Sequence, residues 1–133
     1  MFTFQKAFSS CSVNDLAKAR AFYAETLGLP VKETPEGLSI QVDATYTLFL
    51  YPKPNHTPAT FTVLNFQVAN VEAAVDGLTA AGVKFLQYEG DIKTDQKGIA
   101  RPASGPIIAW FADPAGNIIS VAQNRYSDGR TAP

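Results

Sequence analysis

The sequence has little of the chemistry that most often anchors catalytic sites. Its 133 residues contain one cysteine, Cys11, and one histidine, His56. A single cysteine excludes an intrachain disulfide and a CxxC zinc pair. A single histidine leaves no second imidazole to act as a base or a metal ligand. We therefore expect a reducing, cytoplasmic location and no disulfide framework.

Excess charge and long apolar runs are also missing. Eleven Lys and Arg residues stand against twelve Asp and Glu, which gives a formal net charge of −1. No positive field is therefore available to hold nucleic acid or anionic lipid. No stretch approaches the roughly 20 apolar residues that span a bilayer, and the N-terminal residues lack the pattern of a secretory signal. We expect no nucleic-acid partner, no membrane partner and one globular domain over residues 1–133.

The apolar pattern of the first half predicts a strand, a helix and three further strands. The expected strand within 4–13 is followed by an amphipathic helix that Asn14 or Asp15 caps and Gly28 ends. Short strands are expected near 30–34, 37–42 and 45–51. These elements form module one, residues 4–51. The proline-rich stretch 52–60 predicts a linker, because proline cannot donate to a sheet ladder.

The second half repeats this order. A strand at 61–68 precedes a helix that Asn70 caps and Gly82 ends, and further strands are expected near 83–88, at 107–111 and at 118–122, the last two joined by a turn. Asp15 and Asn70 are 55 residues apart, as are Val13 and Val68, which indicates an internal repeat. Module two spans 61–123, and a polar tail, 124–133, is expected to fray. The predicted fold class is α+β, with two βαβββ modules.

Two stretches carry a family resemblance. Residues 13–29 include Phe22-Tyr23 and Leu27-Gly28-Leu29, and residues 109–117 read Ala-Trp-Phe-Ala-Asp-Pro-Ala-Gly-Asn. They resemble the opening helix and the closing hairpin of the vicinal oxygen chelate superfamily, which includes glyoxalase I, bleomycin-resistance proteins, fosfomycin-resistance enzymes and extradiol dioxygenases. The resemblance implies a curved mixed sheet around a cleft, and a homodimer in which two chains complete their clefts.

The resemblance also implies four metal-ligand positions, one on the first and one on the last strand of each module. In this sequence they fall at Phe8, Val63 and Ser120, and at Leu50, or Leu48 if the hairpin is shorter. None of these residues is a histidine or a carboxylate. Divalent metals need convergent nitrogen, oxygen or sulfur donors. We therefore expect no metal and no other cofactor.

Other candidate catalytic groups have simpler explanations. Cys11 has no basic neighbour in sequence to activate its thiol, and its position predicts that it faces away from the cleft. Ser10 and Ser104 lie in no Gly-x-Ser-x-Gly elbow. His56 is expected to be a solvated residue of the linker. The acidic residues of the long loop, Glu89, Asp91 and Asp95, are expected to form a solvated surface.

Strand alternation predicts how the cleft is lined. If Phe8 points inward, Ser10 and Ser12 share its face, and Val63 brings Asn65 and Gln67 with it. The predicted ligand-binding residues are Phe8, Ser10, Leu50, Val63, Asn65, Trp110 and Ser120. Apolar walls with a few amide and hydroxyl groups favour a neutral, partly aromatic small molecule.

Three functions remain open at this point. The first is a metal-free protein that binds an apolar or aromatic ligand, similar to the bleomycin-resistance branch. The second is an enzyme, either a lyase or dioxygenase of the glyoxalase type with an atypical active site or an isomerase that uses polar side chains. The third is a structural or interaction module in which Phe8, Leu50 and Val63 fill the cleft as core.

Overall fold

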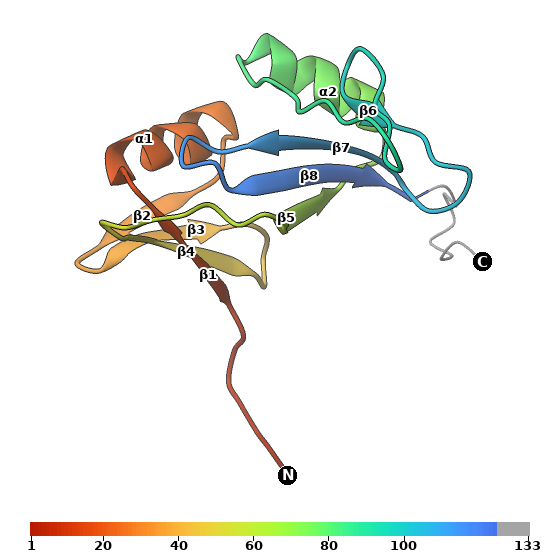
Figure 1. Ribbon diagram of the computed structural model, residues 1–133. Helices are drawn as coiled ribbons and strands as arrows, with labels where there is room; N and C mark the ends of the chain where they lie inside the picture. Colours follow the sequence, from red (N-terminus) through yellow and green to blue (C-terminus); the bar gives the residue numbers. More distant parts are fainter. Residues whose placement is uncertain (125–133) are drawn as a thin grey trace. The chain divides into compact units, whose positions relative to one another are not determined.

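The computed structural model describes residues 1–124 (Figure 1). The chain divides into two compact units, residues 1–58 and the part from Ala59 onward. The boundary lies within the predicted linker, 52–60. Each unit has the order βαβββ, which confirms the predicted α+β class with two modules. Apart from Asn124, the predicted polar tail lies outside the described residues.

The first unit is a four-stranded mixed sheet with one helix. Its elements are β1 (Ser9–Val13), α1 (Leu16–Ala21), the π-helical turn η1 (Phe22–Thr26), β2 (Val31–Thr34), β3 (Gly37–Gln41) and β4 (Thr47–Pro52). The strand order is β1-β4-β3-β2, and β1 and β4 are parallel. The predicted cap is confirmed, because the Asp15 carboxylate accepts the Lys18 backbone N–H at 3.1 Å. Gly28, at φ 72°, ends the helical segment.

The second unit repeats this topology. Its elements are β5 (Thr62–Gln67), α2 (Val71–Ala80), β6 (Ile99–Ala100), β7 (Ile107–Ala112) and β8 (Ile118–Gln123). The strand order is β5-β8-β7-β6, with β5 parallel to β8. Asn70 caps α2 by accepting the Ala73 N–H at 3.0 Å. The predicted turn is closed by Asp113, whose carboxylate accepts the Ala115 and Asn117 N–H groups, each at 2.9 Å.

The prediction of a strand near 83–88 was wrong. Only Phe85 of this segment pairs with the sheet, through an isolated bridge to Phe111. The fourth strand is β6, two buried residues within the segment predicted to be a polar loop. Gly98, at φ 87°, leads into β6, and a Cβ at this position would lie 2.7 Å from the Phe85 Cβ. The absence of a side chain at Gly98 therefore lets the two segments approach each other beside β7.

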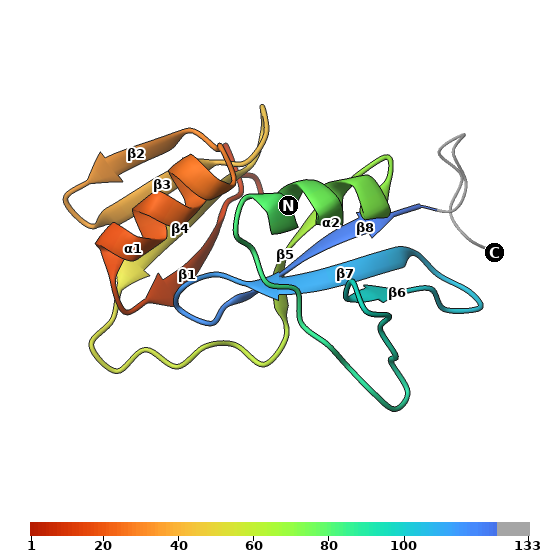
Figure 2. The same cartoon turned by 90° about the horizontal axis from the view of Figure 1, so that it is seen from above.

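In each unit, one face of the sheet packs on the helix (Figure 2). In the first unit this face carries the buried side chains Leu38, Ile40, Leu48 and Leu50. In the second unit it carries Leu64, Ala109, Phe111, Ile119 and Val121, with Val71 and Val75 supplied by α2. We call the opposite side of each sheet its helix-free face. Strand alternation assigns every second residue to that face.

Candidate functional site

The helix-free face of the first unit carries Phe8 and Ser10. Ser10 aligns with Phe49 of β4, and Phe49 aligns with Ser39 of β3, so the three side chains share one side of the sheet. Phe8 is 63% exposed. A depression of about 360 Å³ lies on this unit, and we call it the first hollow. Its lining comprises Lys6, Phe8, Thr34, Glu36, Ser39, Gln41, Thr47 and Phe49.

Leu50 does not share the face of Phe8 and Ser10. It aligns with Cys11 on one side and Leu38 on the other, and it is fully buried in the core. The predicted role of Leu50 as a lining residue is therefore corrected, and Phe49 takes its place. Cys11 lies on the side away from Phe8, as expected.

His56 is bound to the first strand rather than being only a solvated linker residue. Its Nδ1 lies 2.6 Å from the Ser12 Oγ, and both side chains are half-buried. The Lys53 N–H donates to the Val13 carbonyl oxygen at 3.0 Å, so the start of the linker is held along β1. Sequence reasoning missed this pair, because Ser12 and His56 are 44 positions apart and no local pattern indicates that they meet.

The helix-free face of the second unit carries Asn65, Trp110 and Ser120 in one row across three strands. Asn65 aligns with Ser120, and Ser120 aligns with Trp110. The neighbouring row is Gln67, Ala122 and Ile108. The strand register therefore places Asn65, Gln67, Trp110 and Ser120 on one face, as predicted, with Ile108 and Ala122 beside them. Val63 lies at a register shift between Thr62 and Leu64, so it is the extra residue of a bulge.

Ser120 orients Asn65 instead of facing solvent. It is fully buried, and its hydroxyl donates to the Asn65 side-chain oxygen. The expectation that Ser120 contacts a ligand directly is therefore corrected to a positioning role. Trp110 is half-buried and packs edge-to-face on Tyr88, with ring centroids 5.4 Å apart.

A second hollow, of about 440 Å³, lies on this face. The amide side chains of Asn65 and Gln67 line it together with the aliphatic side chains of Ile108 and Ala122. The remaining lining residues are Gly105, Pro106 and Asn124. Such a lining combines apolar contact area with a few oriented polar groups, which is the composition of small-molecule sites.

The side chains at the four family metal positions do not fit a metal ion. Phe8, Leu50 and Val63 are hydrocarbon, and the Ser120 hydroxyl is bonded to Asn65. Within residues 1–124, no group of three or more His, Cys, Asp or Glu side chains is placed to hold a metal. No step of chemistry is therefore assigned to a metal at these positions.

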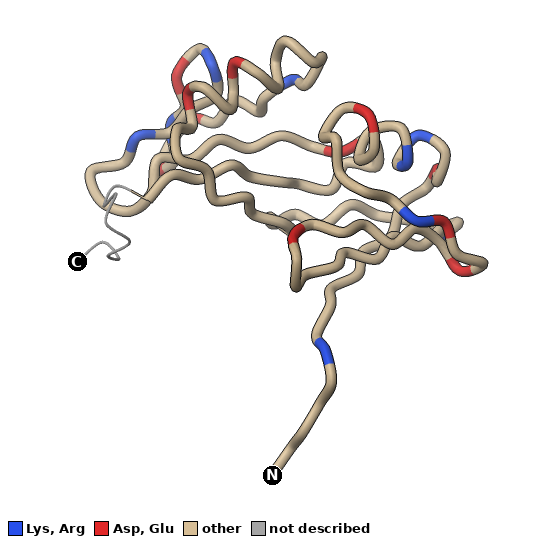
Figure 3. Tube along the Cα trace, turned by 180° about the vertical axis from the view of Figure 1, so that it is seen from behind, with Lys and Arg blue, Asp and Glu red and all other residues tan. Residues whose placement is uncertain are grey.

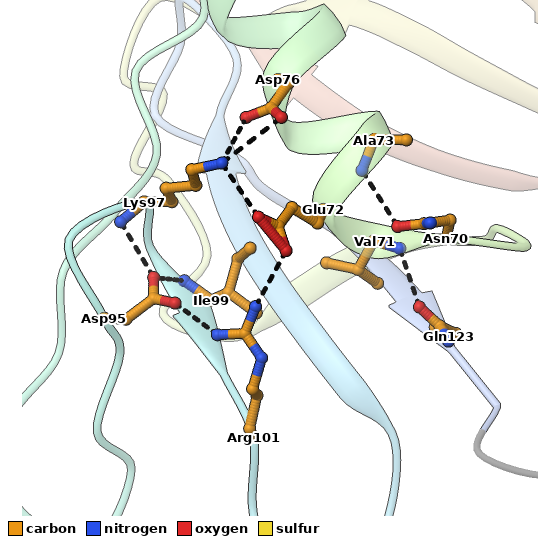
Figure 4. Close-up of polar contacts among 10 residues, drawn as sticks. All are labelled: Asn70, Val71, Glu72, Ala73, Asp76, Asp95, Lys97, Ile99, Arg101 and Gln123. Atoms are coloured by element: carbon orange, nitrogen blue, oxygen red, sulfur yellow. Dashed lines mark hydrogen bonds and ion pairs between the residues drawn. The ribbon is translucent and has the colours of Figure 1, made fainter.

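Charged residues lie mainly on helices and loops, with both signs interspersed along the chain (Figure 3). One cluster joins α2 to the segment around β6 (Figure 4). The Lys97 ammonium lies 3.0 Å from both the Glu72 and the Asp76 carboxylates, and Arg101 pairs with Asp95 and, at 3.5 Å, with Glu72. Asp95, expected to be simply solvated, therefore takes part in an ion-pair network.

The network shifts two pKa values. Burial acts to raise the pKa of Asp95, but hydrogen bonds from the Ile99 N–H, the Arg101 guanidinium and the Lys97 N–H outweigh it and lower that pKa. Hydrogen bonds to Glu72 and Asp76 raise the pKa of Lys97. All the ion-paired side chains are substantially exposed, so each pair contributes little to stability, and the network joins two surface segments.

This chain belongs to the Glyoxalase/Bleomycin resistance protein/Dioxygenase superfamily, whose family model matches residues 9–121. A comparison with curated proteins gave no match. Among the described residues, no helix has the length and hydropathy that a membrane span requires.

Solved structures with the same fold differ in what their names describe. TnmS3, an antibiotic binding protein from Streptomyces sp. CB03234, is 24% identical, with a TM-score of 0.63 and coverage of 92% of this chain and 98% of that chain. The fosfomycin resistance protein FosX from Listeria monocytogenes is 13% identical, with a TM-score of 0.68 and coverage of 96% and 98%. Lactoylglutathione lyase from Agrobacterium tumefaciens is 20% identical, with a TM-score of 0.62 and coverage of 87% and 90%. The TM-scores establish the shared fold, and at identities this low they establish nothing more. The fold does not select among these functions.

Proposed function

We propose that this protein binds a small apolar or aromatic molecule on its helix-free sheet faces and does so without a metal ion. The observation that carries the proposal is the second hollow, in which Asn65 and Gln67 present amide groups beside Ile108 and Ala122. Aliphatic walls supply contact area, and oriented amides fix the polar atoms of a ligand. The hydroxyl of Ser120 holds the side chain of Asn65 in place for this role.

The sole tryptophan supports a direct assay. Trp110 lies in the same row as Asn65 and Ser120, so its fluorescence should report a molecule bound on this face. Naphthol is a suitable neutral probe, and its binding should change the fluorescence and raise the melting temperature. Substituting Trp110→Ala should weaken binding by about 1–3 kcal/mol if the ligand covers the ring.

A matched pair of isoleucine variants tests whether the ligand binds in the second hollow. Ile108→Lys places a charge in the lining of the second hollow, whereas Ile92→Lys places the same charge at a half-exposed isoleucine of the loop. Naphthol should stabilise the wild type and Ile92→Lys more than it stabilises Ile108→Lys. Equal stabilisation of the two variants, or none in any protein, contradicts the proposal.

The metal-free and dimeric parts of the proposal have separate measurements. The residues Phe8, Leu50, Val63 and Ser120 support metal-free binding, because they supply no set of metal donors. Elemental analysis of protein purified without an affinity tag should find no stoichiometric Ni, Zn, Fe or Mn.

Light scattering at tens of micromolar, roughly where a micromolar dimer is populated, should give a homodimer, and a monomer alone would contradict it. A cytoplasmic location stays a prediction that fits the single Cys11.

A second candidate is an acid–base enzyme, such as an isomerase or lyase, and the Ser12–His56 hydrogen bond favours it. An imidazole 2.6 Å from a hydroxyl can hold or move a proton at that oxygen. Such an enzyme should exchange the carbon-bound hydrogens of dihydroxyacetone with deuterated water, as followed by NMR. The rate should fall to background in His56→Gln. No exchange above background in the wild type removes this candidate.

A further inference from the structure

The first hollow contains two opposite charges beside two aromatic rings. Lys6 and Glu36 line it, and so do Phe8 and Phe49. Lys6 belongs to the segment before β1, and Glu36 belongs to the turn between β2 and β3. A cation and an anion therefore reach one hollow from separate segments of the first unit.

The two charges do not neutralise each other. The Lys6 ammonium donates to the Thr47 hydroxyl at 3.1 Å, which anchors it at the hollow and leaves further N–H donors. Within residues 1–124, neither Lys6 nor Glu36 forms an ion pair with another charged side chain. Each charge can therefore pair with a ligand group without first breaking an internal ion pair.

The rings define the body of such a ligand. Phe8 is 63% exposed and Phe49 is half-buried, so both rings offer surface that a flat apolar molecule can cover. Ser39 and Gln41 add a hydroxyl and an amide to the same lining. Apolar contact then supplies most of the affinity, and the two charges select among molecules of similar shape.

We propose that the first hollow selects an aromatic zwitterion, a molecule whose flat apolar body carries one acidic and one basic group. The acidic group pairs with Lys6, the basic group pairs with Glu36, and the body lies against Phe8 and Phe49. This inference rests on the proposed function, since it assigns a charge pattern to the ligand of a helix-free face.

Four probes with the same ring system test the charge pattern: naphthol, naphthoate, naphthylmethylamine and naphthylalanine. Calorimetry with the full chain should give the tightest binding for naphthylalanine, about threefold to tenfold tighter than for naphthol, a factor typical of exposed charge pairs. Lys6→Met should weaken the binding of naphthoate and of naphthylalanine by a similar factor, but it should leave the binding of naphthylmethylamine unchanged. Glu36→Gln should weaken the binding of naphthylmethylamine and of naphthylalanine, but it should leave the binding of naphthoate unchanged. Salt should reduce these differences.

Two variants control for net charge. Lys18→Met and Glu33→Gln remove the same charges from α1 and β2, outside the lining of the first hollow, and should leave the order of the four probes unchanged. If naphthol binds as tightly as naphthylalanine, or if the variants at Lys6 and Glu36 behave as these controls do, the zwitterion inference is overturned while the binding function stands. If none of the four probes binds, the proposed function itself fails.

Discussion

Replacing Phe8 with alanine separates a ligand-binding role from a structural role. Full burial of a phenylalanine side chain contributes about 1.5–3 kcal/mol. Phe8 is 63% exposed, so only about a third of its surface is withdrawn from solvent in the folded chain. The free energy of unfolding should therefore fall by about 1 kcal/mol or less in Phe8→Ala, well below the roughly 3–5 kcal/mol of a core phenylalanine.

The effect on binding should be larger, because a ligand in the first hollow would cover the exposed part of the ring. That surface is worth about 1–2 kcal/mol, which corresponds to a fivefold to thirtyfold increase in Kd. Urea denaturation measures the change in the free energy of unfolding, and calorimetric titration with naphthylalanine measures the change in Kd. The matched control is Phe61→Ala, since Phe61 is 67% exposed and is not part of the lining of the first hollow.

Two results would refute this reasoning. If Phe8→Ala lowers the free energy of unfolding by more than about 2 kcal/mol and leaves Kd unchanged, Phe8 is a packing residue. If Phe61→Ala raises Kd as much as Phe8→Ala does, the loss reflects general surface hydrophobicity rather than the hollow.

Two further predictions concern stability. Gly37→Ala should lower the free energy of unfolding by about 2 kcal/mol or more, because the new Cβ would lie 2.0 Å from the Leu50 carbonyl oxygen. Gly77→Ala, in open space within α2, should raise the free energy of unfolding by up to about 1 kcal/mol. Urea denaturation that ranks the two variants in the opposite order would contradict this packing. The lowered pKa of Asp95 contributes stability that is present above the unfolded value, near 3.8, and is lost as pH falls through the folded value. Acid denaturation should therefore reduce the stability advantage of the wild type over Asp95→Asn below about pH 4, and parallel curves would contradict it.

The fold was predictable because its local signals are strong and occur twice. Asp15 and Asn70 cap helices at equivalent places, and each side chain accepts the backbone N–H three residues further on. The missed element, β6, has only two residues, Ile99 and Ala100. So short a strand has no alternation to detect, and its pairing depends on Gly98 approaching Phe85, a contact that no local pattern encodes.

The candidate site was predictable in the second unit and only partly in the first. In the second unit the polar residues Asn65 and Gln67 alternate with the apolar residues Leu64 and Phe66, which fixes the face of β5. The segment Thr47–Tyr51 is apolar at both parities from Leu48 to Leu50, so alternation could not assign a face, and Leu50 was placed on the wrong side. Lys6 was missed because it lies before the first strand, where strand periodicity gives no position.

The repeat separates what the fold needs from what a binding face needs. The helix-facing sides of the two sheets both consist of buried aliphatic and aromatic residues, because each must pack against a helix. On the helix-free faces the repeat mates differ in chemistry, since Ser10 corresponds to Asn65. The first hollow consequently has rings and opposite charges, and the second has amides and aliphatic groups. Residues on these faces can therefore change without loss of the caps, turns or core, so one fold can carry different binding sites.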